Sequence, residues 1–103
     1  MHARVAIYRI SSGSAEDVAR SADAESGMLG IFQRQEGFAS YELVGAGDIL
    51  ISISRWETEQ QAHAATMAAR SWVAEHLARS VELVHSYVGD VVLSSMTPGV
   101  AGP

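Results

Sequence analysis

The alternation of apolar and polar side chains along the chain predicts four β-strands. These segments cover residues 3–10, 38–44, 49–56 and 83–93. The third segment is rich in isoleucine and ends at Trp56, a pattern typical of a strand that is largely buried. The sequence Gly-Ala-Gly-Asp separates the second and third segments, so we expect these two strands to form a β-hairpin.

The region between the first two strands predicts a helix that begins after Ser14, a good N-cap residue. Apolar residues recur at helical spacing over residues 15–35, and Glu25 is the one acidic residue on the same arc. Gly27 and Gly30 each cost about 1 kcal/mol inside a helix, so we expect this helix to bend or to end early.

A second, longer helix is predicted after Thr58, because Thr is a good N-cap and about twenty residues follow without Gly or Pro. Its small residues would bring the helix close to a sheet or leave room for a ligand. The inward arc of this helix holds Ala62, Ala65, Ala69, Trp72, Val73, His76 and Leu77.

This order of strands and helices predicts an α+β ferredoxin-like βαββαβ fold, in which two helices cover one face of a four-stranded antiparallel sheet. We expect a single such domain over residues 1–93 and a C-terminal tail over residues 94–103. The third and fourth strands are apolar on both faces, although two helices can cover only one. The uncovered face predicts a homodimer, sheet against sheet about a two-fold axis. The alternative is a monomer with an exposed apolar face.

Composition narrows the possible partners. A chain of 103 residues with a formal charge of −5 suits one small domain. The seven basic residues are all Arg and are scattered singly, which disfavours nucleic-acid binding. No segment is apolar for long enough to span a membrane, and the N-terminus does not read as a secretion signal. Because the chain has no cysteine, disulfides and thiolate metal sites are excluded, and we expect a cytoplasmic protein.

Two segments resemble those of a known family. They are Glu-Gly-Phe-Ala-Ser-Tyr-Glu-Leu at residues 36–43 and Arg-Trp-Glu-Thr-Glu-Gln-Gln-Ala at residues 55–62. On these segments the chain, over residues 3–93, resembles the antibiotic-biosynthesis monooxygenase-like domains of the dimeric α/β-barrel superfamily. The resemblance implies a homodimer with one small-molecule pocket per subunit, between the sheet and the helices. Members include cofactor-independent monooxygenases of aromatic polyketides, haem-degrading enzymes and proteins without an assigned activity.

Oxygenation without a metal or flavin needs an electron-rich substrate, a dry aromatic cavity and a group that handles a proton. Our first candidate for that group is His76, which lies one turn after Trp72, with Glu25 or Tyr8 assisting. Two alternatives stay open. His76 is equally consistent with an exposed residue at a helix C-terminus, and Glu25 with a solvated carboxylate at the edge of the apolar stripe.

The candidates for substrate binding are small or aromatic residues that would line the pocket. Strand parity places His85 and Tyr87 on one face, but leaves open whether the helices or a second subunit cover that face. Each aromatic candidate is also consistent with an ordinary core position. The substrate-binding candidates are Trp72, Phe32, Ala65, Ala69, His85 and Tyr87.

Haem degradation is disfavoured. The haem-degrading relatives carry an Asn in the first strand and a Trp about two turns into the second helix. This chain contains no Asn, and its helix Trp is displaced to residue 72. The four histidines show no metal-binding spacing, so we expect no metal and no cofactor.

Two functions remain. The leading hypothesis is a small-molecule-binding homodimer, a cofactor-independent monooxygenase of an aromatic or polyketide-like substrate. The alternative is a non-catalytic ligand-binding or stress-associated dimer whose pocket is filled by core side chains. A cavity below about 300 Å³ between the helices and the sheet would favour this alternative.

Overall fold

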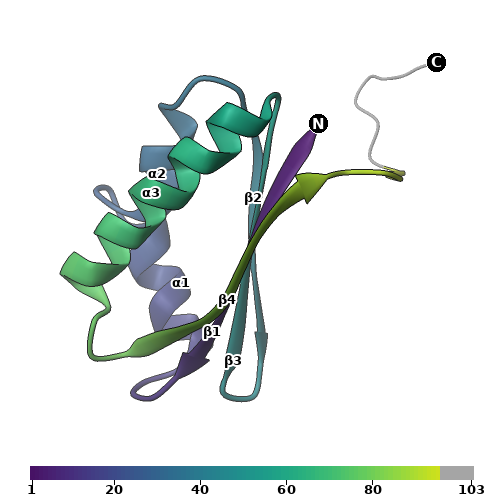
Figure 1. Cartoon of the computed structure of the whole chain (residues 1–103). Helices are drawn as coiled ribbons and strands as arrows, with labels where there is room; N and C mark the ends of the chain where they lie inside the picture. The colour runs from purple at the N-terminus through teal and green to yellow at the C-terminus, as the bar shows by residue number, and fades with distance from the viewer. Residues whose placement is uncertain (96–103) are drawn as a thin grey trace.

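A computed structural model describes residues 1–95 of the chain (Figure 1). Residues 96–103, which make up most of the predicted tail, lie outside the described residues. The elements follow the order strand, two short helices, two strands, long helix, strand. Their bounds are β1 His2–Ile10, α1 Ala15–Asp23, α2 Met28–Gln33, β2 Phe38–Ala46, β3 Ile49–Trp56, α3 Glu59–His76 and β4 Val81–Asp90.

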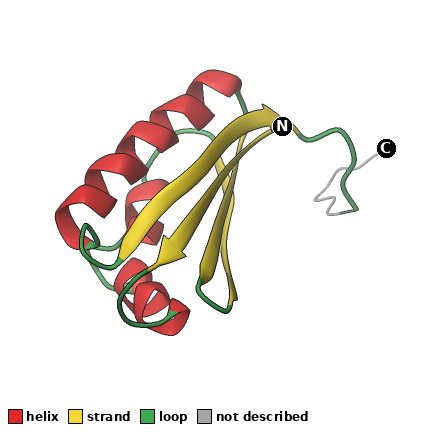
Figure 2. Ribbon diagram, turned by 60° about the horizontal axis from the view of Figure 1, so that its bottom comes forward, coloured by secondary structure: helices red, strands yellow, loops and turns green. Residues whose placement is uncertain are grey.

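The four strands form one antiparallel sheet in the order β2-β3-β1-β4. All three helices lie on the same face of this sheet and leave the other face uncovered (Figures 1 and 2). The predicted ferredoxin-like α+β fold is therefore confirmed. None of the helices in the described part of the chain is long and apolar enough to cross a membrane.

The long helix α3 begins where its capping residues require. Thr58 is the N-cap, and its hydroxyl oxygen accepts a hydrogen bond from the backbone N–H of Gln61 at 3.1 Å. The Gln61 side chain in turn accepts one from the backbone N–H of Thr58 at 3.0 Å. This reciprocal capping box satisfies two of the free N–H groups at the helix start. The predicted cap at Thr58 is confirmed.

The first helical region ends early, as the cost of its glycines predicted, and a second helix follows it. The two helices, α1 and α2, are joined by a turn that contains Glu25. Gly27 is the N-cap of α2, and a Cβ atom there would lie 2.3 Å from the carbonyl oxygen of Ala22. The chain can make this turn only because residue 27 has no side chain. Glu25 is consequently exposed, which agrees with the alternative of a solvated carboxylate and not with a buried position on a helix arc.

The last strand differs from its prediction. It spans residues 81–90 rather than 83–93, and the exposed Val92 and Leu93 lie beyond its end. Ile7 of β1 pairs with His85 of β4, whereas the next residue of β1, Tyr8, pairs with Leu83. The register therefore shifts by one residue, and β4 has one extra residue between these two pairs. The extra residue is a β-bulge, which changes the face that the side chains before it occupy.

An aromatic cluster joins α2 to the sheet. The Phe32 ring packs edge-on against Trp56 and Tyr41, with ring centres 5.3 Å and 5.0 Å apart. Phe38 packs on the other side of Trp56 at 5.6 Å. Edge-to-face pairs at these distances each add about 1 kcal/mol to the burial of their area. Trp56, which is fully buried, is therefore part of the core at the end of β3.

The uncovered face of the sheet, here called the open face, is apolar at its centre. Val5 pairs with Ile53, and Ile7 pairs with Ile51, across β1 and β3. These four side chains are only partly buried, whereas their neighbours on the covered face, such as Ala6 and Leu50, are fully enclosed. Tyr87 extends the open face onto β4 and is 55% exposed.

Candidate functional site

A small cavity lies between the covered face of the sheet and the helices. Its volume is about 20 Å³, enough for one water-sized group and far below the range of ligand pockets. Most of its wall is apolar and comes from α1, α2, α3, β2 and β3. The polar and aromatic side chains at the cavity are Arg4, Tyr8, Tyr41, Ser52 and Trp72.

Arg4 is the unusual member of this set. It alternates with Ala6 and Tyr8 on β1, so its side chain points toward the helices and is only 2% exposed. Nη1 donates a hydrogen bond to the Ser52 hydroxyl at 3.3 Å, and Nη2 donates one to the Tyr8 hydroxyl at 3.5 Å. Nε is buried without a hydrogen-bond partner among the described residues.

No acidic side chain balances the charge of Arg4. The twelve Asp and Glu residues of the sequence all fall within residues 1–95, and every one of them is exposed. Exposed carboxylates form ion pairs with His2, Arg20 and His63 instead. A buried charge is normally paired, because its loss of hydration is costly. The core thus contains a positive charge whose side-chain hydrogen-bond partners are neutral hydroxyl groups.

Tyr41 supplies a neutral phenol next to this charge. Burial raises its pKa from 10.0 to about 12, while a hydrogen bond with Ser52 and the charge of Arg4 act in the opposite direction. Desolvation is the largest cause because it disfavours the phenolate. At neutral pH Tyr41 is therefore protonated and suited to donate a hydrogen bond rather than to act as a base.

A surface groove lies beside this cavity. It has a volume of about 250 Å³ and runs between the helices α1 and α2 and the strand β2. Ala22, Tyr41 and Leu43 line both the groove and the cavity. A ligand that reached the cavity by this path would have to move α1 outward, and α1 buries only Val18 and Ala22.

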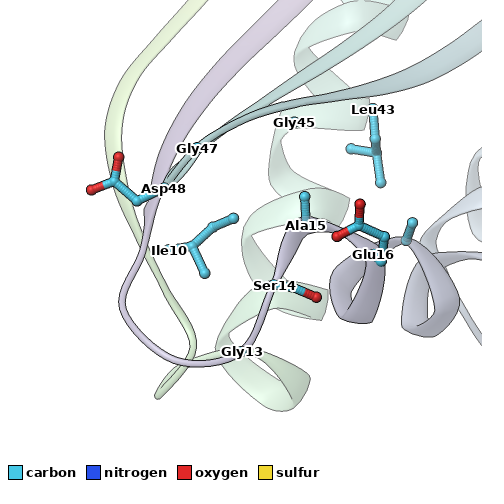
Figure 3. A pocket seen from close by; sticks show the side chains of 10 residues that line it. Ile10, Gly13, Ser14, Ala15, Glu16, Leu43, Gly45, Gly47 and Asp48 are labelled. Carbon is cyan, nitrogen blue, oxygen red and sulfur yellow. The ribbon is translucent and has the colours of Figure 1, made fainter.

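A larger groove lies at the opposite end of α1, beside the β2–β3 turn (Figure 3). It has a volume of about 460 Å³ and is wide open to solvent. Ile10 and Leu43 line it, and Glu16 and Asp48 stand on different sides of it (Figure 3). None of its polar lining side chains is buried, so it lacks the enclosed polar group that marks the Arg4 cavity.

Five of the predicted site residues are buried on the covered side of the sheet. Tyr8, Ala69 and Trp72 line the cavity, as predicted for pocket residues. Phe32 and Ala65 are fully buried beside it but do not line it. The structure therefore brings together only some of the residues that were predicted to line the pocket.

His76 does not reach the cavity. Its ring is exposed, stacks on Trp72 with ring centres 4.9 Å apart, and its Nδ1 lies 3.0 Å from the carbonyl oxygen of Trp72. Leu77, the next residue, takes the inward position and is 8% exposed. The Trp72 indole N–H donates to the carbonyl of Ser26 at 3.2 Å and ties α3 to the α1–α2 turn. His76 thus covers the outer side of Trp72, contrary to its expected inward orientation.

His85 and Tyr87 share one face, as strand parity predicted, but it is the open face. They pair with Ile7 and Val5 of β1, and their rings stack with centres 5.8 Å apart. Both are exposed. Of the two faces left open by the sequence, they therefore lie on the one away from the helices, and they do not line the cavity between the sheet and the helices.

Arg4, Ser52 and Tyr41 were not predicted from the sequence to form a polar group in the core. The signal for Arg4 was its period-two spacing with Tyr8, which places both side chains on one face of β1. Ser52 alternates in the same way with Leu50 on β3. Among residues 1–95, no group of three or more His, Asp or Glu side chains is placed to hold a metal ion.

The sequence matches no protein-family profile and no curated protein sequence. Solved structures do match the fold. SnoaB from Streptomyces nogalater, a cofactor-independent oxygenase, superposes with a TM-score of 0.66 at 17% identity, over 91% of this chain and 95% of SnoaB. A dimeric ferredoxin-like protein from an uncultured marine organism matches with a TM-score of 0.66 at 12% identity, over 92% of this chain and 97% of its own.

A third similar structure is a Bacillus cereus protein provisionally classed as an antibiotic biosynthesis monooxygenase. It has a TM-score of 0.61 at 15% identity and covers 96% of this chain and 98% of its own. These likenesses establish the fold that the family resemblance implied. At such identities they do not establish the reaction.

Proposed function

We propose that this protein is a homodimer that binds an aromatic or polyketide-like small molecule in each subunit and oxidises it with molecular oxygen without a cofactor. The observation that carries this proposal is the polar cluster of Arg4, Ser52, Tyr8 and Tyr41, enclosed at the end of an otherwise apolar cavity. Ligand sites of small-molecule enzymes have this composition, apolar walls with a few convergent polar groups. The fold shared with a cofactor-independent oxygenase supports the type of reaction.

The residues at the cavity suit the steps of such a reaction. Trp72 and its apolar neighbours exclude water, and the neutral Tyr41 phenol is available to orient a ligand oxygen. In the overall reaction a CH₂ group and O₂ give a C=O group and water, so the substrate itself supplies all the electrons. The protein therefore has to bind, orient and shield an electron-rich ring.

The homodimer is proposed from the open face. Its central residues Val5, Ile7, Ile51 and Ile53 form a contiguous apolar surface that no helix covers (Figure 2). Burial of apolar area contributes about 25 cal/mol per Å², so a second sheet packed on this face would stabilise both subunits. A structure with the same fold is a dimeric protein, which supports this arrangement.

The non-catalytic alternative is favoured by one specific observation, the cavity volume. About 20 Å³ is smaller than any aromatic ligand, so the cavity as it stands is filled by core side chains. The proposed enzyme must open this cavity, and the groove beside α1 is the path that we propose for the ligand. In the alternative, α1 stays closed and the protein functions through its surface or its dimer.

Oxygen consumption with a panel of hydroxylated naphthalenes and anthracenes tests the proposal. We expect uptake by the wild type, its loss in Tyr41→Phe and Arg4→Met, and wild-type rates in His76→Ala, because His76 lies outside the cavity. Heat-denatured protein controls for autoxidation of the substrates. If no compound is consumed and none binds, the non-catalytic alternative is the better description.

A further inference from the structure

We infer that Arg4 is an anion-binding residue, which selects ligands that present a negatively charged oxygen over neutral ligands of the same shape. The oxygen belongs to a carboxylate or to an ionised phenol or enol. This inference rests on the proposed binding function and names the chemical class of its ligand. It assigns the recognition of that ligand to one side chain on β1.

The charge balance of the core is the first observation. Arg4 is the only charged residue in the buried class among residues 1–95, and every carboxylate in the sequence is exposed. A guanidinium keeps its charge in folded proteins. The ligand-free protein therefore buries a permanent positive charge that no residue of the described chain neutralises.

The hydrogen-bonding capacity of Arg4 is the second observation. A guanidinium has five N–H groups arranged in a plane, a geometry that matches a carboxylate or a single charged oxygen. The protein supplies two neutral acceptors, the hydroxyls of Ser52 and Tyr8. The Nε–H group is buried and unpartnered, so the side chain has a donor to spare.

The cavity beside Arg4 is the third observation. Its volume of about 20 Å³ exceeds the roughly 10–15 Å³ that one water-sized group requires. It thus holds one ligand oxygen or one small free anion, but not the body of an organic molecule. Ala22, Tyr41 and Leu43 line both this cavity and the neighbouring groove of about 250 Å³, and the ligand ring would lie in that groove.

A purely structural role is the competing explanation. The guanidinium lies 5.8 Å from the centre of the Phe32 ring, within reach of a cation–π contact. Such a contact stabilises the side chain in place but gives no reason for the protein to prefer anionic ligands. The two roles therefore differ in ligand selectivity, because only an anion-binding Arg4 gives the protein a preference for the charged ligand.

The test compares 1-naphthoate with 1-naphthamide, which has nearly the same shape and no charge, by isothermal titration calorimetry on the full chain. We expect the wild type to bind 1-naphthoate at least about ten-fold more tightly than 1-naphthamide. Arg4→Met should remove this preference and leave the affinity for 1-naphthamide within about two-fold of the wild type. Arg70→Met, which removes an exposed arginine from α3, is the matched control and should keep the preference.

A second measurement does not depend on a variant that folds. The NMR signal of the Arg4 Nε–H group in the wild type is followed as formate or the neutral formamide is added. We expect a saturable shift with formate only. A response to formate without binding of either naphthalene supports the anion site and contradicts the aromatic-ligand function.

Other outcomes would contradict the anion selectivity or the role of Arg4 and leave the proposed binding function standing. Equal affinity of the wild type for 1-naphthoate and 1-naphthamide overturns the anion selectivity and leaves the binding function standing. A preference that survives in Arg4→Met overturns the role of Arg4. If no compound binds and formate leaves the Nε–H signal in place, both the anion site and the binding function fall.

Discussion

The Arg4 guanidinium lies over the ring of Phe32, 5.8 Å from its centre, and both side chains are almost completely buried. This pair connects β1 to α2 at the centre of the domain. A desolvated cation–π contact contributes about 2 kcal/mol, whereas an unpaired buried charge costs several kcal/mol. Arg4 therefore costs the ligand-free protein stability, which is the usual relation between a functional residue and the fold that holds it.

Replacement of Arg4 by Met should stabilise the ligand-free protein. Met has a similar length and no charge, so the free energy of unfolding should rise by about 1–2 kcal/mol. Urea unfolding followed by circular dichroism measures this change. Arg70→Met should alter the free energy by no more than about 0.5 kcal/mol, because Arg70 is exposed. A loss of stability in Arg4→Met would mean that the guanidinium is a structural requirement of the core.

Stability should fall steeply at alkaline pH because of Tyr41. Its pKa is about 12 in the folded protein and near 10 in the unfolded chain, so the unfolded chain loses its proton first. The contribution is complete below pH 10 and is lost as the pH rises toward 12, by up to about 3 kcal/mol in total. Urea unfolding between pH 9 and 11.5 should show this fall in the wild type and a shallower one in Tyr41→Phe. Identical slopes in the two proteins would rule out a raised pKa at Tyr41.

The turn between α1 and α2 should not tolerate a side chain at residue 27. A Cβ atom in Gly27→Ala would lie 2.3 Å from the Ala22 carbonyl oxygen, so the backbone must shift. We expect a loss of about 2 kcal/mol in the free energy of unfolding. Gly89→Ala is the control, because nothing lies within 4 Å of the added atom and its effect should be near zero. Equal effects in the two variants would show that the turn relaxes freely.

The features that could be predicted from the sequence are those determined by residues that lie close together in the sequence. The cap at Thr58, the bounds of β3 and the order of elements depend on local chemistry and periodicity, and they are confirmed. The division of the first helix depends on a close backbone contact of Gly27 that the sequence does not show. The cost of a glycine inside a helix, however, could be predicted from the sequence. The position of the bulge in β4 depends on pairing with β1, which no local pattern encodes.

The candidate site was harder to predict because it depends on side chains that meet across elements. The helix arc was right for Ala69 and Trp72, but one step of 100° separates the inward Leu77 from the exposed His76. Arginine is usually exposed in folded proteins. For that reason Arg4 was not predicted to point inward, although strand parity assigns it this position. The anion site emerges only when Arg4, Tyr8 and Ser52 are seen together.

Charge at the centre of the open face should separate the proposed dimer into monomers. Ile51 pairs with Ile7 at the middle of this face, and its side chain is only partly buried in the single subunit. In Ile51→Glu the carboxylate of each subunit would lose its hydration in the dimer without a partner, at a cost of several kcal/mol per carboxylate. The two costs together are comparable to the roughly 8 kcal/mol of a subunit association at micromolar concentration. Sedimentation should give a dimer for the wild type and a species near 11.0 kDa for the variant.

Met67→Glu, on the outer side of α3 where Met67 is 63% exposed, should remain a dimer. A wild type that sediments as a monomer at micromolar concentration would contradict the sheet-to-sheet assembly, whereas the ligand selectivity assigned to Arg4 would stand, because that residue faces the helices within one subunit.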